Sequence, residues 1–528
     1  MGNTQKILLV SLLAVGLVVG WAFGSVAQQS LLRVNFAWPT FIDPAVGNDF
    51  SSSSSLVNLY DSLVYPTPEG GVTPSVASRW DVSDDALTWT FHLRRGIRFH
   101  DETELTAEDV AFSMNRLLTI GEGYAFLFLG RVEKADALDD FTVQFKLSQP
   151  FGPFLTSLVR LYILNQACIR ANIKQPGDYG AFGDFGRDYL LTHDCGSGPY
   201  KVQEVQLEES VRMEKFDGYW GEFLPGAPDE VLFTGISDPV TVRTLLERGE
   251  MEISDQWLPL EQFQALGRTS GIDVGQWVSG SMLYLMMHNQ RAPTDNIHFR
   301  RALAYALNYD VVTSRIFPGT RKATGPVTSS LPGFNPDVIE YSFDLERARQ
   351  ELALSDYAGE TIQYMWTAEV PDLEKIALMF QADAARIGID IEIVKVPWLN
   401  MIENASNPDT TGHIMSIWVA PHFTEAGSLL ESKYHSSSTG TWEQTEWLQD
   451  PVIDQLIDDS IATVDTEDRF AKYRLIQEVV ATLVPSVFVY EQMERHAYQS
   501  SYVNWTQLEN PNPVMGYNFA ARFIEVRQ

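Results

Sequence analysis

The chain has 528 residues, of which 45% are hydrophobic, 12% aromatic and 20% charged. This composition excludes disorder as the main state, and the length predicts two to four domains. Only one long apolar run occurs, so a polytopic membrane protein is excluded. A formal net charge of −31 opposes binding to nucleic acid and, by keeping copies apart, predicts a monomer.

The N-terminal segment has the layout of a secretory signal peptide. Lys6 precedes an apolar run at residues 7–23, and the small residues Ser25 and Ala27 follow it. We expect cleavage after Ala27, and an uncleaved membrane anchor is the alternative. The mature chain is therefore predicted to be exported and periplasmic.

Elements with strand periodicity dominate the first part of the mature chain. We expect a strand at residues 31–38, a hairpin made of residues 88–93 and 97–99, and another strand at 141–147. A helix is expected to begin at Thr106, which is a good N-cap, because acidic residues follow in its first turn.

Strands and helices alternate in the rest of the chain, which predicts α/β lobes with mixed sheets. A hairpin is expected at residues 200–216 and a β-α-β unit at 231–254, with Gly249 ending its helix. Further helices are expected at 373–387 and 468–483, and further strands at 389–396, 413–418 and 487–490. Linkers rich in proline or glycine are absent, and the serines at 51–55 are the only low-complexity patch.

The only two cysteines, Cys168 and Cys195, are predicted to form a disulfide because export places them in an oxidising compartment. Cys195 also precedes a glycine-rich turn at residues 196–199, where the chain can bend toward a partner. The alternative is a pair of buried free thiols.

Common catalytic motifs are missing. The sequence has no Walker A loop, no G-x-S-x-G elbow and no H-E-x-x-H motif. The histidines His413, His422 and His435 have a spacing that fits no metal site. We therefore expect no enzyme activity, no metal and no cofactor.

Aromatic residues that follow predicted strands are candidates for a ligand-binding cleft, since clefts in α/β proteins are lined by the ends of strands. Core packing is the alternative for each of them. The candidates are Trp38, Phe41, Trp257, Trp398 and Trp418.

A series of motifs lies between Asp61 and Arg116. It comprises D-S-L-V, P-x-V-A-x-x-W, T-W-T-F-x-L-R, G-I-x-F-H-D and T-A-E-D-V-A-F-S. Later come Gly198-Pro199-Tyr200 and an R-R-A-L-A helix at 300–304. Together they resemble the extracellular solute-binding proteins of the peptide/nickel family (family 5, cluster C) of ABC importers. The resemblance covers essentially the whole mature chain and departs at Glu102-Thr103, where the family usually has Gly-Thr or Gly-Ser.

The resemblance implies an α/β, two-lobed periplasmic-binding-protein-like (type II) fold with mixed sheets, a hinge between the lobes and an extra subdomain on the first lobe. The expected divisions are a signal peptide at 1–27, lobe I at 28–70, 196–290 and 497–528, the extra subdomain at 71–195, and lobe II at 291–496.

The resemblance also implies a function. The chain would capture a small solute between its lobes and deliver it to the transmembrane subunits of an ABC permease. A secreted hydrolase acting on glycosides or peptides, and an adhesion or chaperone-like surface protein, are the alternatives.

The solute is predicted from one departure. Peptide binders of the family have a W-x-x-D segment whose Asp pairs with the peptide's amino group, but here Pro421 follows Trp418 at that spacing. Glu425 could substitute for the Asp; otherwise a neutral sugar-like solute is favoured over a peptide. Asn289, Glu425 and Trp442 are the further binding candidates.

Overall fold

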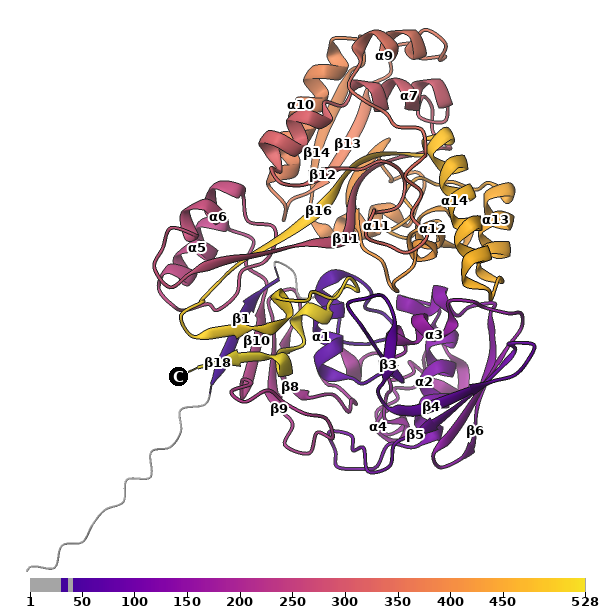
Figure 1. The fold of residues 1–528 in the computed structure, drawn as a ribbon, viewed down its shortest axis with the longest axis vertical. Helices are drawn as coiled ribbons and strands as arrows, with labels where there is room; N and C mark the ends of the chain where they lie inside the picture. Colours follow the sequence, from indigo (N-terminus) through magenta and orange to yellow (C-terminus); the bar gives the residue numbers. More distant parts are fainter. Residues whose placement is uncertain (1–29, 37–40, 528) are drawn as a thin grey trace, which may run out of the picture.

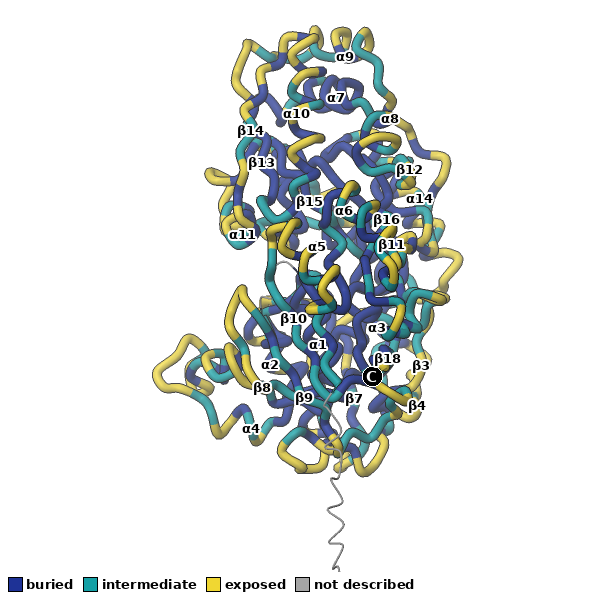
Figure 2. The backbone as a smooth tube through the Cα atoms, turned by 90° about the vertical axis from the view of Figure 1, so that its left-hand side faces the viewer, coloured by how far each residue is buried: buried dark blue, intermediate teal, exposed yellow. Residues whose placement is uncertain are grey.

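The computed structural model describes residues 30–36 and 41–527. These residues form two α/β lobes stacked along the long axis of the molecule, and two long neighbouring strands run from one lobe into the other (Figure 1). Buried backbone continues through both lobes (Figure 2). The predicted signal peptide and Trp38 lie outside the described residues.

Lobe I is built on a four-stranded sheet. In spatial order its strands are β1 (Leu31–Asn35), β10 (Glu230–Thr234), β9 (Ser210–Lys215) and β8 (Tyr200–Gln206). β1 and β10 are parallel, whereas β9 is antiparallel to both neighbours, so the predicted hairpin at 200–216 is confirmed. The C-terminal pair β17 (Val503–Trp505) and β18 (Ile524–Val526) returns to this lobe (Figure 1).

The serine run at 51–55, which reads as a low-complexity patch, forms the buried helix α1 (Phe50–Leu59). Asp49 caps this helix by accepting a hydrogen bond from the Ser52 amide at 2.8 Å. The chain returns closely to this helix: a Cβ on Gly516 would lie 2.7 Å from the carbonyl carbon of Ser53, so residue 516 has to be a glycine. The serine hydroxyls bond to neighbouring groups such as the Phe50 carbonyl, so their burial leaves few polar atoms unpaired.

An additional subdomain packs beside lobe I and has its own four-stranded sheet. The strands in spatial order are β4 (Ala77–Val82), β5 (Thr88–Leu93), β7 (Thr142–Leu147) and β6 (Val132–Asp139). The predicted helix is present as α2 (Ala107–Ile120), and Thr106 and Asp109 form its capping box. Residues from the sheet, including Phe91 and Phe145, pack edge to face in the core of the subdomain.

The predicted pairing of residues 88–93 with 97–99 is wrong. Both edges of β5 are occupied, one by β4 and the other by β7. Residues 97–105 instead form a loop in which the Leu105 amide donates to the Ile97 carbonyl at 2.9 Å. Ile97 and Phe99 are buried in this loop, so their alternation reflects burial rather than strand pairing.

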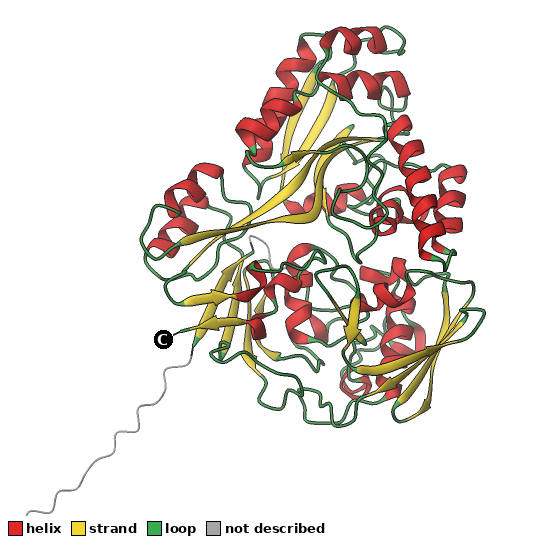
Figure 3. Ribbon diagram, in the orientation of Figure 1, coloured by secondary structure: helices red, strands yellow, loops and turns green. Residues whose placement is uncertain are grey.

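Lobe II contains a six-stranded mixed sheet flanked by helices (Figure 3). Its strands in order are β12 (Arg321–Lys322), β16 (Ser486–Tyr498), β11 (Asp273–Met287), β15 (Ile414–Val419), β13 (Ile362–Thr367) and β14 (Ile391–Val396). The main helices are α7 (Ile297–Ala306), α9 (Leu345–Leu352), α10 (Asp372–Ala385), α12 (Ala426–Tyr434), α13 (Pro451–Ile461) and α14 (Thr466–Leu483). The helices predicted at 373–387 and 468–483 are confirmed.

The two strands that connect the lobes are β11 and β16, which pair antiparallel along most of their length. The strand predicted at 487–490 therefore continues far beyond its expected end. Of the predicted β-α-β unit, β10 and α5 (Pro239–Glu247) are present, but no strand forms at 251–254. Ile253 makes only isolated bridges, to Val34 and Tyr498. The predicted boundaries at 70, 195, 290 and 496 stay predictions.

Cys168 and Cys195 form a disulfide with their Cα atoms 5.9 Å apart, as the sequence predicts. Cys168 belongs to α4 (Gln166–Ala171), a short helix of the subdomain. Within residues 30–36 and 41–527 there is no group of three potential metal ligands, and no helix there is long and apolar enough to cross a membrane.

Replacing both cysteines by serine should lower the free energy of unfolding by about 3–4 kcal/mol, because the closed loop restricts the unfolded chain. The sequence separation of 27 residues sets this magnitude. Guanidinium unfolding of the oxidised protein and of the Cys168→Ser/Cys195→Ser variant measures the difference. Identical midpoints would contradict the expectation.

Candidate ligand-binding cleft

A chamber lies between the two lobes, at the level where β11 and β16 pass from one to the other. It contains about 560 Å³ of space outside protein atoms, part of which is open to solvent. Lobe I contributes the start of α1, and lobe II contributes the ends of β13 and β15 together with the start of α11 (Trp398–Ala405). We call this space the tryptophan chamber, because Trp257, Trp398, Trp418 and Trp442 line it.

The four tryptophans form two contacting pairs. The ring centroids of Trp257 and Trp418 are 4.7 Å apart, and those of Trp398 and Trp442 are 5.4 Å apart in an edge-to-face arrangement. The Trp418 indole donates to the Tyr490 hydroxyl at 3.1 Å, which fixes the orientation of its ring. Such oriented aromatic faces offer a large apolar contact area with little loss of conformational entropy on binding.

Uncharged polar groups complete the wall. The side chains of Gln256 and Gln492 form no hydrogen bond with the described residues, and the Gln256 Oε1 atom is buried. Buried polar atoms normally have partners, so these two amides are available to a bound solute. Among the lining residues that the structure describes, Asp49 is the one carboxylate, and it already accepts from Ser52 and from the Trp398 indole at 3.3 Å.

Two of the tryptophans also join the lobes. Trp398 donates to Asp49 as described, and the Trp442 indole nitrogen lies 3.4 Å from the Asn48 Oδ1 atom. Both acceptors lie at the start of α1 in lobe I, whereas both donors belong to lobe II. The structure is therefore a closed arrangement of the cleft.

A second set of contacts joins lobe II to the subdomain. Arg131, just before β6, forms an ion pair with Glu431 of α12, and their side chains are only 7% and 2% exposed. Arg160 donates to the His422 carbonyl at 3.1 Å, and this contact is also buried. Closing the lobes thus buries charge as well as aromatic surface.

The connecting strands bend where they pass the chamber. The pairing of β11 with β16 shifts register between Val278 and Met282, and Ser281 in this interval lines the chamber. Gln492 approaches from β16 at the same level. A β-bulge of this kind redirects side chains and leaves the strands able to flex, as a hinge requires.

Four residues predicted from the sequence, Trp257, Trp398, Trp418 and Trp442, come together in the tryptophan chamber. Phe41 instead lines a separate cavity of lobe I with Arg187. Trp38 lies outside the described residues.

Asn289 and Glu425 do not line the chamber. The Asn289 amide donates to the Met287 carbonyl at 2.7 Å and so serves the backbone at the end of β11. The Glu425 carboxylate is engaged by the Arg469 guanidinium at 2.8 and 2.9 Å and by the Tyr473 hydroxyl at 3.1 Å. An ammonium group would have to compete with these partners to reach it.

Pro421 packs against the bend of the connecting strand, since a Cβ on Gly280 would lie 2.7 Å from the Pro421 ring. This position therefore presents no carboxylate to the cleft. Gln256 and Gln492 also line the chamber, although the sequence does not predict them as binding residues. Gln256 adjoins a predicted tryptophan, but nothing in the local sequence marks Gln492, whose direction depends on the bulge.

Asp255 holds the segment that presents Trp257. Its carboxylate accepts from the Trp257 amide at 2.6 Å and also from the Asn35 side chain. Burial raises the pKa of Asp255 to about 6 from its ordinary value of 3.8, although these hydrogen bonds act in the opposite direction. The folded protein therefore binds a proton at this site more readily than the unfolded chain does.

The contribution of Asp255 to stability should be complete below pH 3.8 and should be lost as the pH rises through about 6. The corresponding change is about 3 kcal/mol in the free energy of unfolding. Urea unfolding of the native protein and of Asp255→Asn at pH 4 and pH 7 tests this: the variant should gain relative to the native protein at pH 7. An unchanged difference between the two proteins would contradict the assignment.

The fold and the cleft define a class: two α/β lobes that close on a solute through two connecting strands. The model of the bacterial extracellular solute-binding proteins, family 5 (middle), matches residues 71–441. The chain belongs to this family of ABC importer proteins, and it is a solute-binding protein rather than an enzyme.

Individual relatives agree with this assignment. A protein of Escherichia coli K12 named "Probable D,D-dipeptide-binding periplasmic protein" is 28% identical over 481 residues, which cover 89% of this chain and 90% of the relative. The structure of an ABC transporter-associated periplasmic binding protein from Helicobacter pylori, in complex with a peptide, matches with a TM-score of 0.84 at 22% identity. That match covers 95% of this chain and 99% of the other. A dipeptide-binding protein from Pseudoalteromonas in complex with Met-Leu has a TM-score of 0.85 at 19% identity, over 94% of this chain and 100% of that one. The predicted two-lobed periplasmic-binding-protein fold is confirmed.

Proposed function

We propose that the tryptophan chamber binds a short peptide or peptide-like solute and that the chain carries it through the periplasm to an ABC permease. The observation that carries this proposal is the meeting of four tryptophans and two unpartnered amides on one chamber between the lobes. Amide side chains can bond both to the N–H and to the C=O groups of a peptide backbone. The names of the dipeptide-binding relatives support the same solute class.

We expect the protein to capture its solute by closing the two lobes around it. A solute that contacts Trp257 of lobe I and Trp418 of lobe II binds the closed form better than the open form, and so shifts the population toward closure. The permease would then receive the closed, loaded form.

A neutral oligosaccharide is the second candidate solute. The oriented Trp257 and Trp418 rings and the lack of a free carboxylate in the chamber wall favour it, because sugar rings stack on aromatic faces. A thermal-shift screen against dipeptides and oligosaccharides separates the candidates, since a solute at 100 times its Kd stabilises by about 2.7 kcal/mol.

Trp418→Ala should weaken binding of the solute found in that screen by about thirtyfold or more, because buried aromatic anchors carry most of the binding energy of such sites. Calorimetric titration gives the affinity. Trp80→Ala removes a tryptophan from the subdomain sheet and should leave the affinity unchanged. Equal affinities of the two variants would contradict the proposed site.

A further inference from the structure

A second chamber adjoins the tryptophan chamber. The two share Trp257, Trp418, Gln256 and Gln492, so the pair of tryptophan rings forms a wall between them. The second chamber extends between α6 (Leu260–Leu266) and β16 and contains about 430 Å³ of space outside protein atoms, part of which is open to solvent. A solute held against the tryptophans can therefore extend one end into it.

Arg495 of β16 lines the second chamber and is the one cation among the described residues that line either chamber. Its guanidinium donates to the Pro318 carbonyl and forms no ion pair with any described carboxylate. Burial lowers the pKa of Arg495, and the Tyr490 hydroxyl, which acts in the opposite direction, is not a carboxylate. A half-buried cation without a counter-ion is unfavourable unless something else supplies the negative charge.

The chamber has one carboxylate of its own, and it is already neutralised. Asp372, at the start of α10, lies 2.7 Å from the Lys375 ammonium. The remaining wall is apolar or uncharged, with Phe317 and Tyr490 as its larger members. The second chamber therefore has one uncompensated positive charge, in a protein whose net charge is −31.

We propose that the solute carries a carboxylate, and that Arg495 binds this carboxylate in the second chamber while the rest of the solute lies between the tryptophans. This inference rests on the proposed function and specifies its solute. Gln256 and Gln492, which face both chambers, bind the neutral part of the molecule next to the acid.

The chemistry favours a carboxylate over a more highly charged anion. A single guanidinium can pair with a carboxylate through two parallel hydrogen bonds, and one positive charge balances one negative charge. A phosphate would bring a second charge that no other cation of the chamber wall could balance. The C-terminal carboxylate of a peptide and the carboxylate of an acidic sugar share this chemistry.

The test uses protein purified from the periplasm. The probes come in pairs that differ in whether they carry a free carboxylate. The probes are a dipeptide library prepared as free acids and as C-terminal amides, together with galacturonic-acid oligomers and neutral galactose oligomers. Members with a free carboxylate should bind about tenfold to a hundredfold more tightly than their neutral counterparts, which is the range of charge-assisted hydrogen bonds. The class that binds then identifies the source of the carboxylate.

Arg495→Gln should remove this preference, and Arg495→Lys should keep part of it because the charge remains. Arg268→Gln, an exposed change outside both chambers, alters net charge equally and should bind like the native protein. Two results would overturn this inference and leave the proposed function intact. One is equal binding of acid and neutral probes by the native protein, and the other is an unchanged preference for acid probes in Arg495→Gln. Failure of every probe to bind the native protein would overturn the proposed function and, with it, the inference.

Discussion

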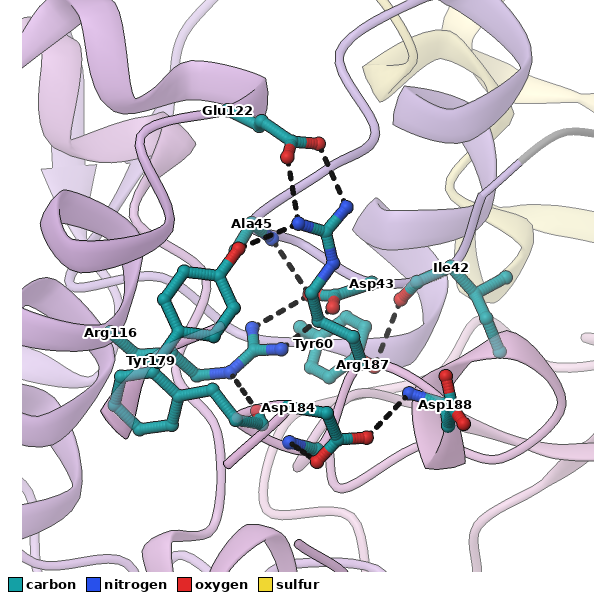
Figure 4. A network of polar contacts seen from close by, with 12 residues as sticks. Ile42, Asp43, Ala45, Tyr60, Arg116, Glu122, Tyr179, Asp184, Arg187 and Asp188 are labelled. Atoms are coloured by element: carbon teal, nitrogen blue, oxygen red, sulfur yellow. Dashed lines mark hydrogen bonds and ion pairs between the residues drawn. The ribbon is translucent and has the colours of Figure 1, made fainter. Parts of the chain in front are cut away.

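Arg116→Met should lower the free energy of unfolding by about 3–5 kcal/mol, which is the range for removing one partner of a buried ion pair. The Arg116 guanidinium pairs with both oxygens of Asp43 at 2.7 Å and donates to the Phe185 carbonyl at 2.9 Å. The two side chains are 0% and 6% exposed, so the variant would leave the Asp43 charge without its partner (Figure 4). Urea unfolding measures the loss.

A neighbouring pair provides the matched control. Arg187 also forms two hydrogen bonds with a carboxylate, that of Glu122, but these side chains are 32% and 48% exposed (Figure 4). Arg187→Met should therefore change stability by less than about 1 kcal/mol. Asp43→Asn in the Arg116→Met background should recover part of the loss, because it removes the unpaired charge. Similar losses in Arg116→Met and Arg187→Met would contradict the reasoning.

The buried pair also matters for the cleft. Asp43 lies on the segment that carries the chain from β1 to α1, and the Asp43 carboxylate accepts from the Ala45 amide at 2.9 Å. Arg116 of α2 thereby holds this segment against the subdomain. Asn48 and Asp49, which contact the tryptophans of lobe II, follow directly. Loosening the pair should move these contacts as well as lower stability.

Local signals in the sequence predicted much of the fold. Thr106 and the acids after it identified the start of α2, and alternating apolar residues identified β5, β7, β8 and β9. The departure at Glu102 also has a structural counterpart. This residue has φ of +70°, a left-handed conformation that glycine adopts more readily, at the turn where the family usually has glycine.

Features that depend on distant contacts could not be predicted in this way. The serine run reads as low complexity, yet it forms the buried helix α1, whose backbone lies so close to the C-terminal segment that residue 516 has to be a glycine. From the sequence, Glu425 is a candidate to bind an ammonium group. In the fold, its carboxylate is already paired with Arg469 of lobe II.

In the cleft, too, some residues can be predicted from local sequence patterns, and others depend on contacts between distant parts of the chain. Three of its tryptophans follow strands or a bridged segment, which is a local pattern, so the sequence identified them. Gln492 lies in the interval where the register of β16 against β11 shifts, whereas Arg495 lies in the regularly paired part of β16 beside it. A one-residue shift of register moves a strand's side chains to the opposite face, and no local pattern records it.

Arg131→Met should shift the protein toward an open form and weaken solute binding by about a hundredfold or more. In the closed arrangement the variant leaves Glu431 buried without its cation, a loss of about 3–5 kcal/mol, whereas in an open form water can solvate that carboxylate. Burial already raises the pKa of Glu431 even with Arg131 present, so the unpaired carboxylate would be costly. Small-angle scattering with and without solute, and calorimetric titration, measure the two effects.

Two further variants distinguish an effect on lobe closure from a general loss of stability. Glu431→Gln added to Arg131→Met should restore most of the affinity, because neither charge then remains buried. Lys134→Met removes an exposed ion pair with Asp136 from the same strand β6 and should leave both readings unchanged. An Arg131→Met protein that closes and binds as the native one does would show that the Arg131–Glu431 pair joins parts that never separate. The hinge movement would then have to leave the subdomain and α12 together and open the cleft elsewhere.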